Sequence, residues 1–280
     1  MNSKQPNCQN LLQIAQNNDI SQEDTKKLAK SFFDITAGGG DYLDGSTAEF
    51  FELIYQKFPK SKILKNYLID IYGDLINNGM DDEYLPKMEQ IIGKPQNESA
   101  AERKVDALKN RYYDELCVTG MEPDWEKCIN NVNKIEEIFH WFPQNEYIAL
   151  RFAEALQKLT LKQDIEACKT TVQRLENLLE YTKVNQLTNA NGIVGNLTFG
   201  LKNLSIKQNE QESQKTINRI EEIVAQFPEN GFIKLYLAYA LETFAKYKHG
   251  KDREQIINRL MEISKIWEPA QRMADAIRNL

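Results

Sequence analysis

The feature of the sequence that most restricts its fold is a motif that occurs three times. In each copy an apolar helical pattern leads to Phe-Pro, which is followed by a polar pair and a second apolar helical pattern. The copies are centred on Pro59, Pro143 and Pro228. Apolar residues spaced three and four apart run through most of the chain, whereas the alternating pattern of a strand is hard to find. The sequence therefore predicts an all-α fold.

The prolines also give the length of a repeat. Pro59, Pro143 and Pro228 are 84 and 85 residues apart, Pro95 lies between the first two, and Pro269 follows Pro228 by 41 residues. The boundary near 182–185 lacks a proline, although the apolar pattern before it matches the others. The mean spacing from Pro59 to Pro269 is 42 residues. A period in this range, with two helices in each unit, is typical of an α-solenoid.

Local signals give the expected helix boundaries. Proline disfavours helical backbone in the residue before it and fits the first turn of the next helix, so each proline predicts a corner. Ser46 with Glu49, and Thr160 with Gln163, match the capping box of a helix start. Glycines that suit left-handed helix ends are Gly38, Gly79, Gly120 and Gly250. The fourteen predicted helices are 7–17, 21–36, 46–58, 61–77, 82–92, 97–118, 123–142, 145–160, 163–182, 187–205, 210–226, 230–248, 252–267 and 269–279.

The repeat resembles a degenerate tetratricopeptide repeat (TPR). In that family the proline is followed after nine, ten and thirteen residues by a large, a small and a large side chain. The matching residues here are Phe152, Ala153 and Leu156 after Pro143, Leu237, Ala238 and Leu241 after Pro228, and Leu68, Ile69 and Tyr72 after Pro59. The resemblance covers residues 46–280 and implies a right-handed α-solenoid of antiparallel helical hairpins. The alternative is an irregular helical bundle.

Two features depart from the family pattern. The period exceeds the usual 34 residues by about eight, and Thr47, Asn131 and Thr216 replace a small residue early in the second helix. Residues 1–40 are predicted to form an N-terminal helical pair with a Gly-rich connector. Residues 41–280 are predicted to form the repeat domain, continuous with that pair.

The resemblance also implies a binding surface on the concave side of the superhelix. Positions four, seven, eleven and fourteen residues after the prolines would line it. The candidate partner-binding residues are Asn66, Asp70, Tyr147, Leu150, Glu154, Gln157, Phe232, Leu235, Tyr239 and Glu242. Aromatic anchors would supply affinity for a peptide, and the acids would select a basic or polar partner. Alternatively, Leu150 and Leu235 belong to the core between repeats.

The sequence offers no recognisable catalytic or metal-binding pattern. Neither of the two histidines, His140 and His249, has a cysteine or second histidine at ligand spacing. The cysteines, Cys8, Cys117, Cys128 and Cys168, match neither a redox nor a zinc pattern and are predicted to be reduced and mostly buried. The recurring pairs Glu136-Glu137 and Glu221-Glu222 are interpreted as a solvated face. We therefore expect that the protein is not an enzyme and that it binds no cofactor and no metal.

Charge and targeting signals restrict the partners. Thirty-five Lys and Arg against 41 Asp and Glu give a net charge of −6, which argues against nucleic acid and anionic membranes as partners. The N-terminus lacks the apolar core of a secretory signal, and no apolar run reaches the length of a membrane span, so a cytoplasmic location is predicted. The basic cluster Lys246–Arg253 is interpreted as a solvated helix end, with an anionic partner site as the alternative.

These observations predict a non-catalytic scaffold or adaptor that binds a protein or peptide on its concave face. The alternative is a regulatory protein that senses a peptide or ligand by compacting its superhelix. That alternative rests on Gly192, Gly195 and Gly200, which would loosen their helix. The same glycines would otherwise permit close contact between helices. An enzyme with a site held by helical hairpins is a third hypothesis, and the oligomeric state stays open.

Overall fold

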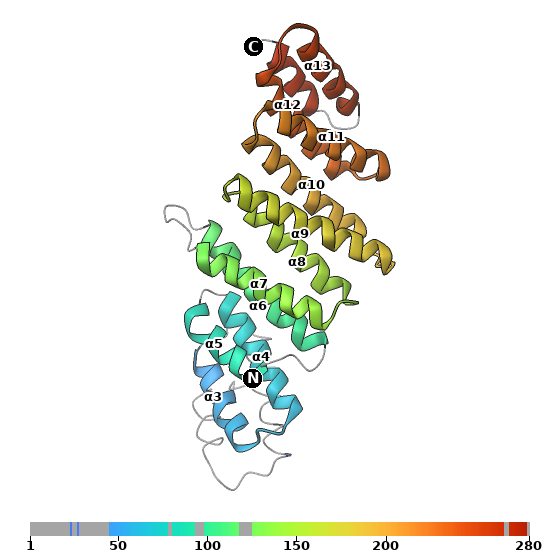
Figure 1. Ribbon diagram of the computed structural model, residues 1–280. Coiled ribbons are helices and arrows are strands. Elements are labelled where there is room, and N and C mark those ends of the chain that lie inside the picture. Colours follow the sequence, from blue (N-terminus) through green and yellow to red (C-terminus); the bar gives the residue numbers. More distant parts are fainter. Residues whose placement is uncertain are drawn as a thin grey trace, which may run out of the picture. The chain divides into compact units, whose positions relative to one another are not determined.

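The described part of the chain is entirely helical in its regular structure. The computed structural model describes Glu23, Lys27 and residues 45–77, 80–92, 98–117, 125–265 and 269–278. Within these ranges the all-α prediction is confirmed (Figure 1). The helices expected at 7–17 and 21–36, the Gly-rich connector, the domain boundary at residue 40 and the caps at Gly38, Gly79 and Gly120 lie outside the described residues.

Twelve α-helices and one 3-10 turn are found in the described ranges, and their ends fall within about four residues of the predicted ones. They are α3 (Gly45–Lys57), α4 (Lys62–Asn77), α5 (Asp81–Ile92), α6 (Glu98–Cys117), α7 (Trp125–Trp141), α8 (Glu146–Leu159), α9 (Ile165–Val184), α10 (Ala190–Lys207), α11 (Glu210–Gln226), α12 (Gly231–Phe244), η1 (Ala245–Tyr247), α13 (Gly250–Ser264) and α14 (Pro269–Arg278).

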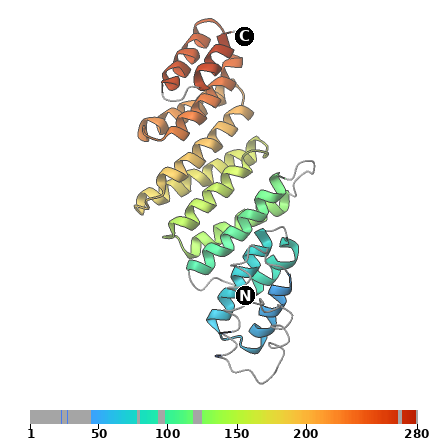
Figure 2. The ribbon, with the colours of Figure 1, turned by 180° about the vertical axis from the view of Figure 1, so that it is seen from behind.

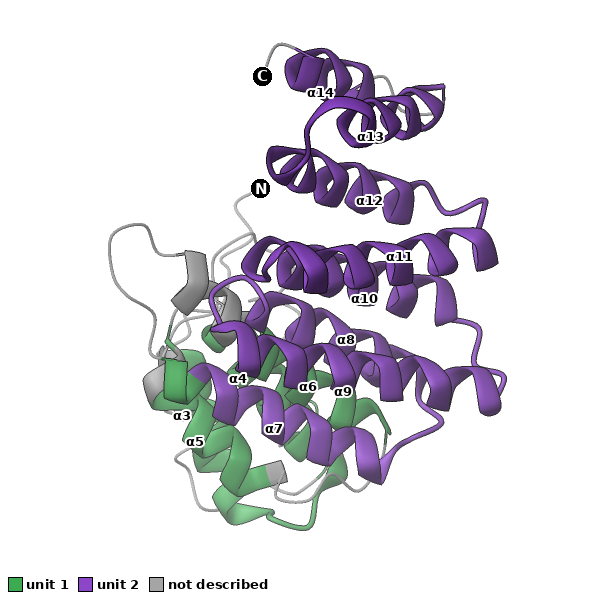
Figure 3. Ribbon diagram, turned by 45° about the horizontal axis from the view of Figure 1, so that its top comes forward, with its two compact units in different colours: residues 1–127 green, residues 128–280 purple. Residues whose placement is uncertain are grey.

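The chain divides into two compact units, residues 1–127 and 128–280 (Figure 3). In unit 1, α4 packs against α3, α5 and α6. Its core is aromatic and aliphatic, with Phe50, Phe51, Leu68 and Tyr72 almost completely buried. Burial of such side chains is the main stabilising contribution to the unit.

In unit 2 the helices follow one another in two rows (Figures 1 and 2). Each helix from α8 to α13 contacts the next one along the chain, and α10 also contacts α8 and α12, while α12 contacts α14. Phe139 of α7 stacks on Phe152 of α8 and meets Tyr181 of α9 edge-on. Because α10 contacts both α8 and α12, these three helices form one continuous row.

Three helices begin with the same tight turn. Backbone N–H groups donate to the carbonyl three residues earlier from Ser61 to Phe58 (2.9 Å), from Asn145 to Phe142 (3.0 Å) and from Asn230 to Phe227 (3.1 Å). Proline stands second in each turn, where its fixed φ is favourable. The prediction that proline occupies the first helical turn is therefore wrong for Pro59, Pro143 and Pro228 and correct for Pro269, the first residue of α14, whereas Pro95 lies outside the described residues.

The fourth residue of the turn also caps the helix that follows. Asn145 Oδ1 accepts a hydrogen bond from the backbone N–H of Ile148 (3.0 Å). Asn230 Oδ1 accepts one from Ile233 (3.4 Å), in the same register. These side chains satisfy N–H groups that have no partner within the helix.

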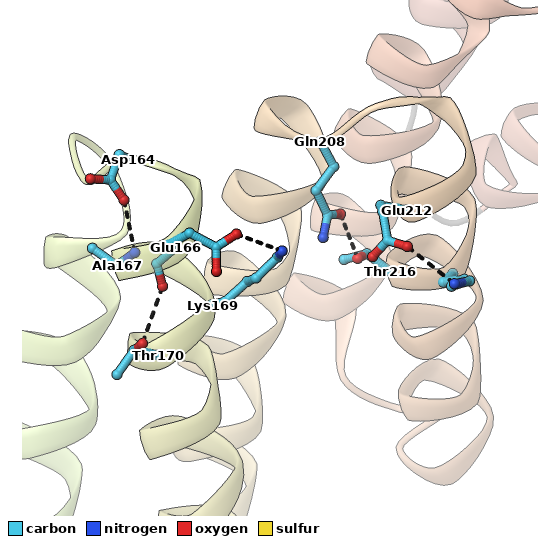
Figure 4. A network of polar contacts seen from close by, with 9 residues as sticks. Asp164, Glu166, Ala167, Lys169, Thr170, Gln208, Glu212 and Thr216 are labelled. Carbon is cyan, nitrogen blue, oxygen red and sulfur yellow. Dashed lines mark hydrogen bonds and ion pairs between the residues drawn. The ribbon is translucent and has the colours of Figure 1, made fainter.

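Two predicted capping boxes are wrong. Asp164, not Thr160, caps α9, because its side chain accepts from the N–H of Ala167 (2.8 Å; Figure 4). Thr160 instead ends α8, and its hydroxyl donates to the carbonyl of Gln157 (2.6 Å). Ser46 lies inside α3, which begins at Gly45. In both cases the helix is shifted relative to the expected cap.

A buried polar contact joins the end of α10 to α11. The Thr216 hydroxyl donates to Gln208 Oε1 at 2.6 Å (Figure 4). Thr216 is one of the residues that replace the small side chain of the family pattern, and this contact satisfies its hydroxyl in the interior.

The boundary that lacks a proline is closed by a left-handed residue. Gln186 has φ 57°, and the N–H of Leu187 donates to the carbonyl of Thr182 (3.0 Å), which is the pattern of a Schellman helix end. Gly250 is also left-handed, at φ 53°, as the sequence predicted. It begins α13, however, whereas α12 ends at Phe244.

Ion pairs connect α7, α9, α11 and α13 in succession. Glu136 of α7 pairs with Arg174 of α9 (2.7 Å), and Glu176 of α9 pairs with Arg219 of α11 (3.3 Å). In the same way Glu221 of α11 pairs with Arg259 of α13. The interpretation of Glu136 and Glu221 as merely solvated is therefore wrong, although partly exposed pairs of this kind contribute only about 0–1 kcal/mol each.

Candidate functional site

The helices α8, α10 and α12 share one pattern of burial. In α8 and α12 the buried positions include Ile148, Phe152 and Leu156, and Ile233, Leu237 and Leu241. The buried Ile193, Leu197 and Leu201 of α10 fall 45 residues after the α8 set and 40 before the α12 set. The three helices can therefore be compared position by position.

This register defines a surface that we call the α8–α10–α12 face. Eight of its residues are predicted site residues and four are additional ones from α10. Its members are Tyr147, Leu150, Glu154 and Gln157 of α8, Gly192, Gly195, Phe199 and Lys202 of α10, and Phe232, Leu235, Tyr239 and Glu242 of α12. None of the twelve is fully buried.

The α10 residues were missed as groove positions because no proline precedes that helix to count from. A signal for them was nevertheless present in the sequence. A large residue followed by a small one recurs at the equivalent position of each helix, as Phe152-Ala153, Leu197-Thr198 and Leu237-Ala238. Counting from these pairs places Phe199 and Lys202 on the face.

Direct contacts join the three helices of the face. A Cβ atom added at Gly192 would lie 2.8 Å from Leu150 Cδ1, so α10 and α8 approach closely there. The rings of Phe199 and Tyr236 meet edge-on, with centroids 5.1 Å apart, and so connect α10 to α12. Leu150 therefore packs against the neighbouring helix while remaining partly accessible.

The glycines of α10 differ from one another. A Cβ atom at the buried Gly200 would lie 3.2 Å from Leu175 Cδ1 of α9, which fits the prediction of close helix contact. A Cβ atom at Gly195 would meet nothing within 4 Å. Gly195 therefore leaves open backbone in the middle of the face.

Two aromatic side chains of the same face are accessible. Phe232 is 69% exposed and Tyr239 is 39% exposed. A pocket of about 590 Å³ lies where α10 and α12 begin, and its lining includes Gly192, Pro228 and Phe232. Asn230 Nδ2 donates to the carbonyl of Asn191 across it (3.2 Å). Such a pocket can hold an apolar side chain of a ligand.

The charged groups of the face are only partly paired. Arg151 binds Glu154 (2.9 Å), donates to the Tyr147 hydroxyl (3.1 Å) and lies over the Tyr147 ring. Glu154 is therefore already neutralised within α8. Lys202 donates to Asn203 Oδ1 (2.8 Å), and burial lowers the pKa of its ammonium group.

Asn203, which accepts a hydrogen bond from Lys202, also makes a buried hydrogen bond of its own. Asn203 Nδ2 donates to the hydroxyl of Thr160 at 2.9 Å and so joins α10 to the end of α8. Both Asn203 and Thr160 are almost completely buried. Separating α10 from the end of α8 would leave this buried amide unpaired, which is costly, so the bond stabilises the contact between the two helices.

The other two predicted site residues belong to unit 1. Asp70 of α4 pairs with Arg103 of α6 (2.7 Å), and the same arginine donates to the backbone carbonyl of Asn66 (3.5 Å). Burial raises the pKa of Asp70 more than Arg103 lowers it. The carboxylate already has a cationic partner inside its own unit.

Other candidate groups are accounted for by structure. Cys128 and Cys168 are buried and form no disulfide, as predicted, and burial raises the pKa of Cys168 to about 11. Lys248 of the basic cluster pairs with Glu210 (2.7 Å), so part of that cluster is neutralised. His140 is exposed in the last turn of α7, where a helix end favours a positive charge.

The described ranges contain neither a metal-binding cluster nor a helix suited to cross a membrane. In them no group of three or more His, Cys, Asp or Glu side chains is placed to hold a metal ion. No described helix combines the length and the apolar character that crossing a membrane requires.

Comparison of the chain with protein-family models, with curated proteins and with solved structures gives no match.

Proposed function

We propose that residues 46–280 form a right-handed, TPR-like α-solenoid of antiparallel hairpins that acts as a non-catalytic scaffold. In this proposal the α8–α10–α12 face is part of the concave surface and binds a protein or peptide. The recurrence of the Phe-Pro turn, its capping residue and the burial register of α8, α10 and α12 supports the repeat. The cytoplasmic location is part of the same proposal.

The observation that carries the binding role is the exposure of Phe232 and Tyr239 on the same face that contains Gly195. Truncating a buried aromatic anchor in an interface commonly costs more than about 1 kcal/mol, so accessible aromatic groups are natural binding residues. The missing side chain at Gly195 lets a bound backbone approach α10 closely. The pocket beside Phe232 would receive one apolar side chain of the ligand.

The first test uses peptides selected from a random library against the full chain. The Phe232→Ala variant should bind the selected peptides about tenfold or more weakly than the parent, as measured by fluorescence anisotropy. Val184→Ala is the matched control. Val184 is also 69% exposed, is the last residue of α9 and is not a member of the α8–α10–α12 face.

The control should bind like the parent chain. Equal weakening by Phe232→Ala and Val184→Ala, or no weakening by Phe232→Ala, would contradict the proposed face. A peptide-sensing regulator predicts a further change, namely a smaller radius of gyration by small-angle X-ray scattering when the peptide is bound. The scaffold proposal predicts an unchanged radius.

A further inference from the structure

Unit 1 contains a pocket of about 420 Å³ between α3, α4 and α5. This volume falls in the range of about 300–1,000 Å³ that is usual for small-ligand sites. Its polar lining consists of Glu52, Tyr55 and Gln56 of α3, Tyr72 of α4, and Lys87 and Gln90 of α5. The pocket could not be predicted from the sequence, because these residues come together only when three helices pack.

The Glu52 carboxylate is held in place by one of its two oxygens. The Tyr72 hydroxyl donates to Glu52 Oε1 at 2.8 Å, and Lys87 Nζ donates to the same oxygen at 3.1 Å. Among the described residues, none donates to Glu52 Oε2. The Glu52 side chain is 24% exposed, so this second oxygen is available to a ligand in the pocket.

Glu52, Glu83 and Lys87 form a cluster with a net negative charge, because two carboxylates share one ammonium group. Lys87 also pairs with Glu83 (3.2 Å) and lies over the Tyr84 ring, so one ammonium group serves two carboxylates. Burial alone would lower the pKa of Lys87, but its hydrogen bonds to Glu52 and Glu83 raise it overall. Burial and the bond to Glu52 raise the pKa of Tyr72, so its hydroxyl stays protonated and donates.

We propose that this pocket binds a guanidinium group, which donates to Glu52 Oε2. A guanidinium is planar, so it can lie against the Tyr55 ring while donating sideways to a carboxylate. The side-chain oxygens of Gln56 and Gln90 provide neutral acceptors for its remaining N–H groups. The ligand supplies the positive charge that the Glu52, Glu83 and Lys87 cluster lacks.

The test uses N-acetyl-arginine amide and N-acetyl-citrulline amide as probes with the full chain. The two compounds have nearly the same shape, and only the first is charged. Isothermal titration calorimetry should show binding of the arginine compound and at least tenfold weaker binding of the citrulline compound. Equal affinity for both compounds, or no binding of the arginine compound, would overturn the proposal.

Two substitutions give effects of opposite sign. Glu52→Gln should weaken binding of the arginine compound at least tenfold. Lys87→Met should strengthen it severalfold, because it removes the internal cation that competes for Glu52. A weakening by Lys87→Met in a variant that retains its helical circular dichroism would overturn the proposal, so the test does not depend on Glu52→Gln folding.

Two further measurements complete the design. Lys162→Met is the control for Lys87→Met, because it removes the same charge from an exposed position in unit 2 and should leave the affinity unchanged. The peptide Gly-Gly-Arg-Gly-Gly identifies the source of the group. Tighter binding of the peptide than of the blocked amino acid assigns the pocket to an arginine of a peptide, and tenfold weaker binding assigns it to a free small molecule.

Discussion

Asn145 and Asn230 each stabilise two adjoining pieces of backbone. The backbone N–H closes the Phe-Pro turn, and the side chain accepts a hydrogen bond from the first turn of the following helix. One residue thus satisfies groups on both sides of a corner between helices. This double use explains why a polar residue follows the Phe-Pro pair at a fixed distance.

Removing such a cap should destabilise unit 2. Asn145→Ala is expected to lower the free energy of unfolding by about 1 kcal/mol, within the range of about 0.5–2 kcal/mol for lost caps. Urea denaturation monitored by circular dichroism measures this difference. The turn retains its backbone hydrogen bond, so the variant should still fold.

Asn130→Ala is the control for this substitution. Asn130 lies on the exposed side of α7, inside the helix, where alanine is the more favourable residue. It should leave the free energy of unfolding unchanged or slightly higher. An equal loss of stability in both variants would contradict the assigned capping role.

At the scale of an element, α10 combines two kinds of glycine. Gly195→Ala should raise the free energy of unfolding by about 0.5–1 kcal/mol, because alanine favours the helix and its Cβ meets open space. Gly200→Ala should gain less or lose stability, because its Cβ would press on Leu175. Thermal unfolding of the two variants gives the comparison.

The opposite order would show that Gly195, rather than Gly200, is the site of close packing. The relative stability of the Gly195→Ala and Gly200→Ala variants also bears on function. A glycine that costs stability and touches no neighbour is expected where a ligand approaches the backbone. Gly195→Gln should therefore preserve the fold and weaken binding of the selected peptides.

The helices themselves could be predicted from the sequence, because apolar spacing and the Phe-Pro turns are local signals. The start of α9 could not be predicted, because Thr160 and Asp164 are both favourable N-cap residues and the choice between them depends on packing. The left-handed Gln186 was equally hidden, because a non-glycine residue rarely adopts that conformation. Glu136 looked solvated because its partner Arg174 is on another helix.

The candidate site was predicted in part. Counting from prolines found the α8 and α12 residues of the face, and Phe232 and Tyr239 are indeed accessible. It could not find Phe199 or Lys202, because no proline precedes α10 in its repeat. It also could not foresee that Glu154 is neutralised by Arg151, since a pairing within one turn depends on side-chain geometry.

At the scale of the whole molecule, the two proposed sites belong to different units and recognise different chemistry. The α8–α10–α12 face of unit 2 offers aromatic and aliphatic groups, whereas the pocket of unit 1 offers a carboxylate. The net charge of −6 is compatible with cationic ligands and cationic segments of partners. Phe232→Ala should therefore leave binding of N-acetyl-arginine amide unchanged.

The central claim is that a peptide or protein binds on the α8–α10–α12 face. The most direct measurement is photo-crosslinking of a library-selected peptide to the 280-residue chain that carries benzoyl-phenylalanine at position 239 or, as control, at position 184. We expect crosslinking from position 239 and little or none from position 184. Crosslinking from position 184 alone, or equally from both positions, would contradict the claim.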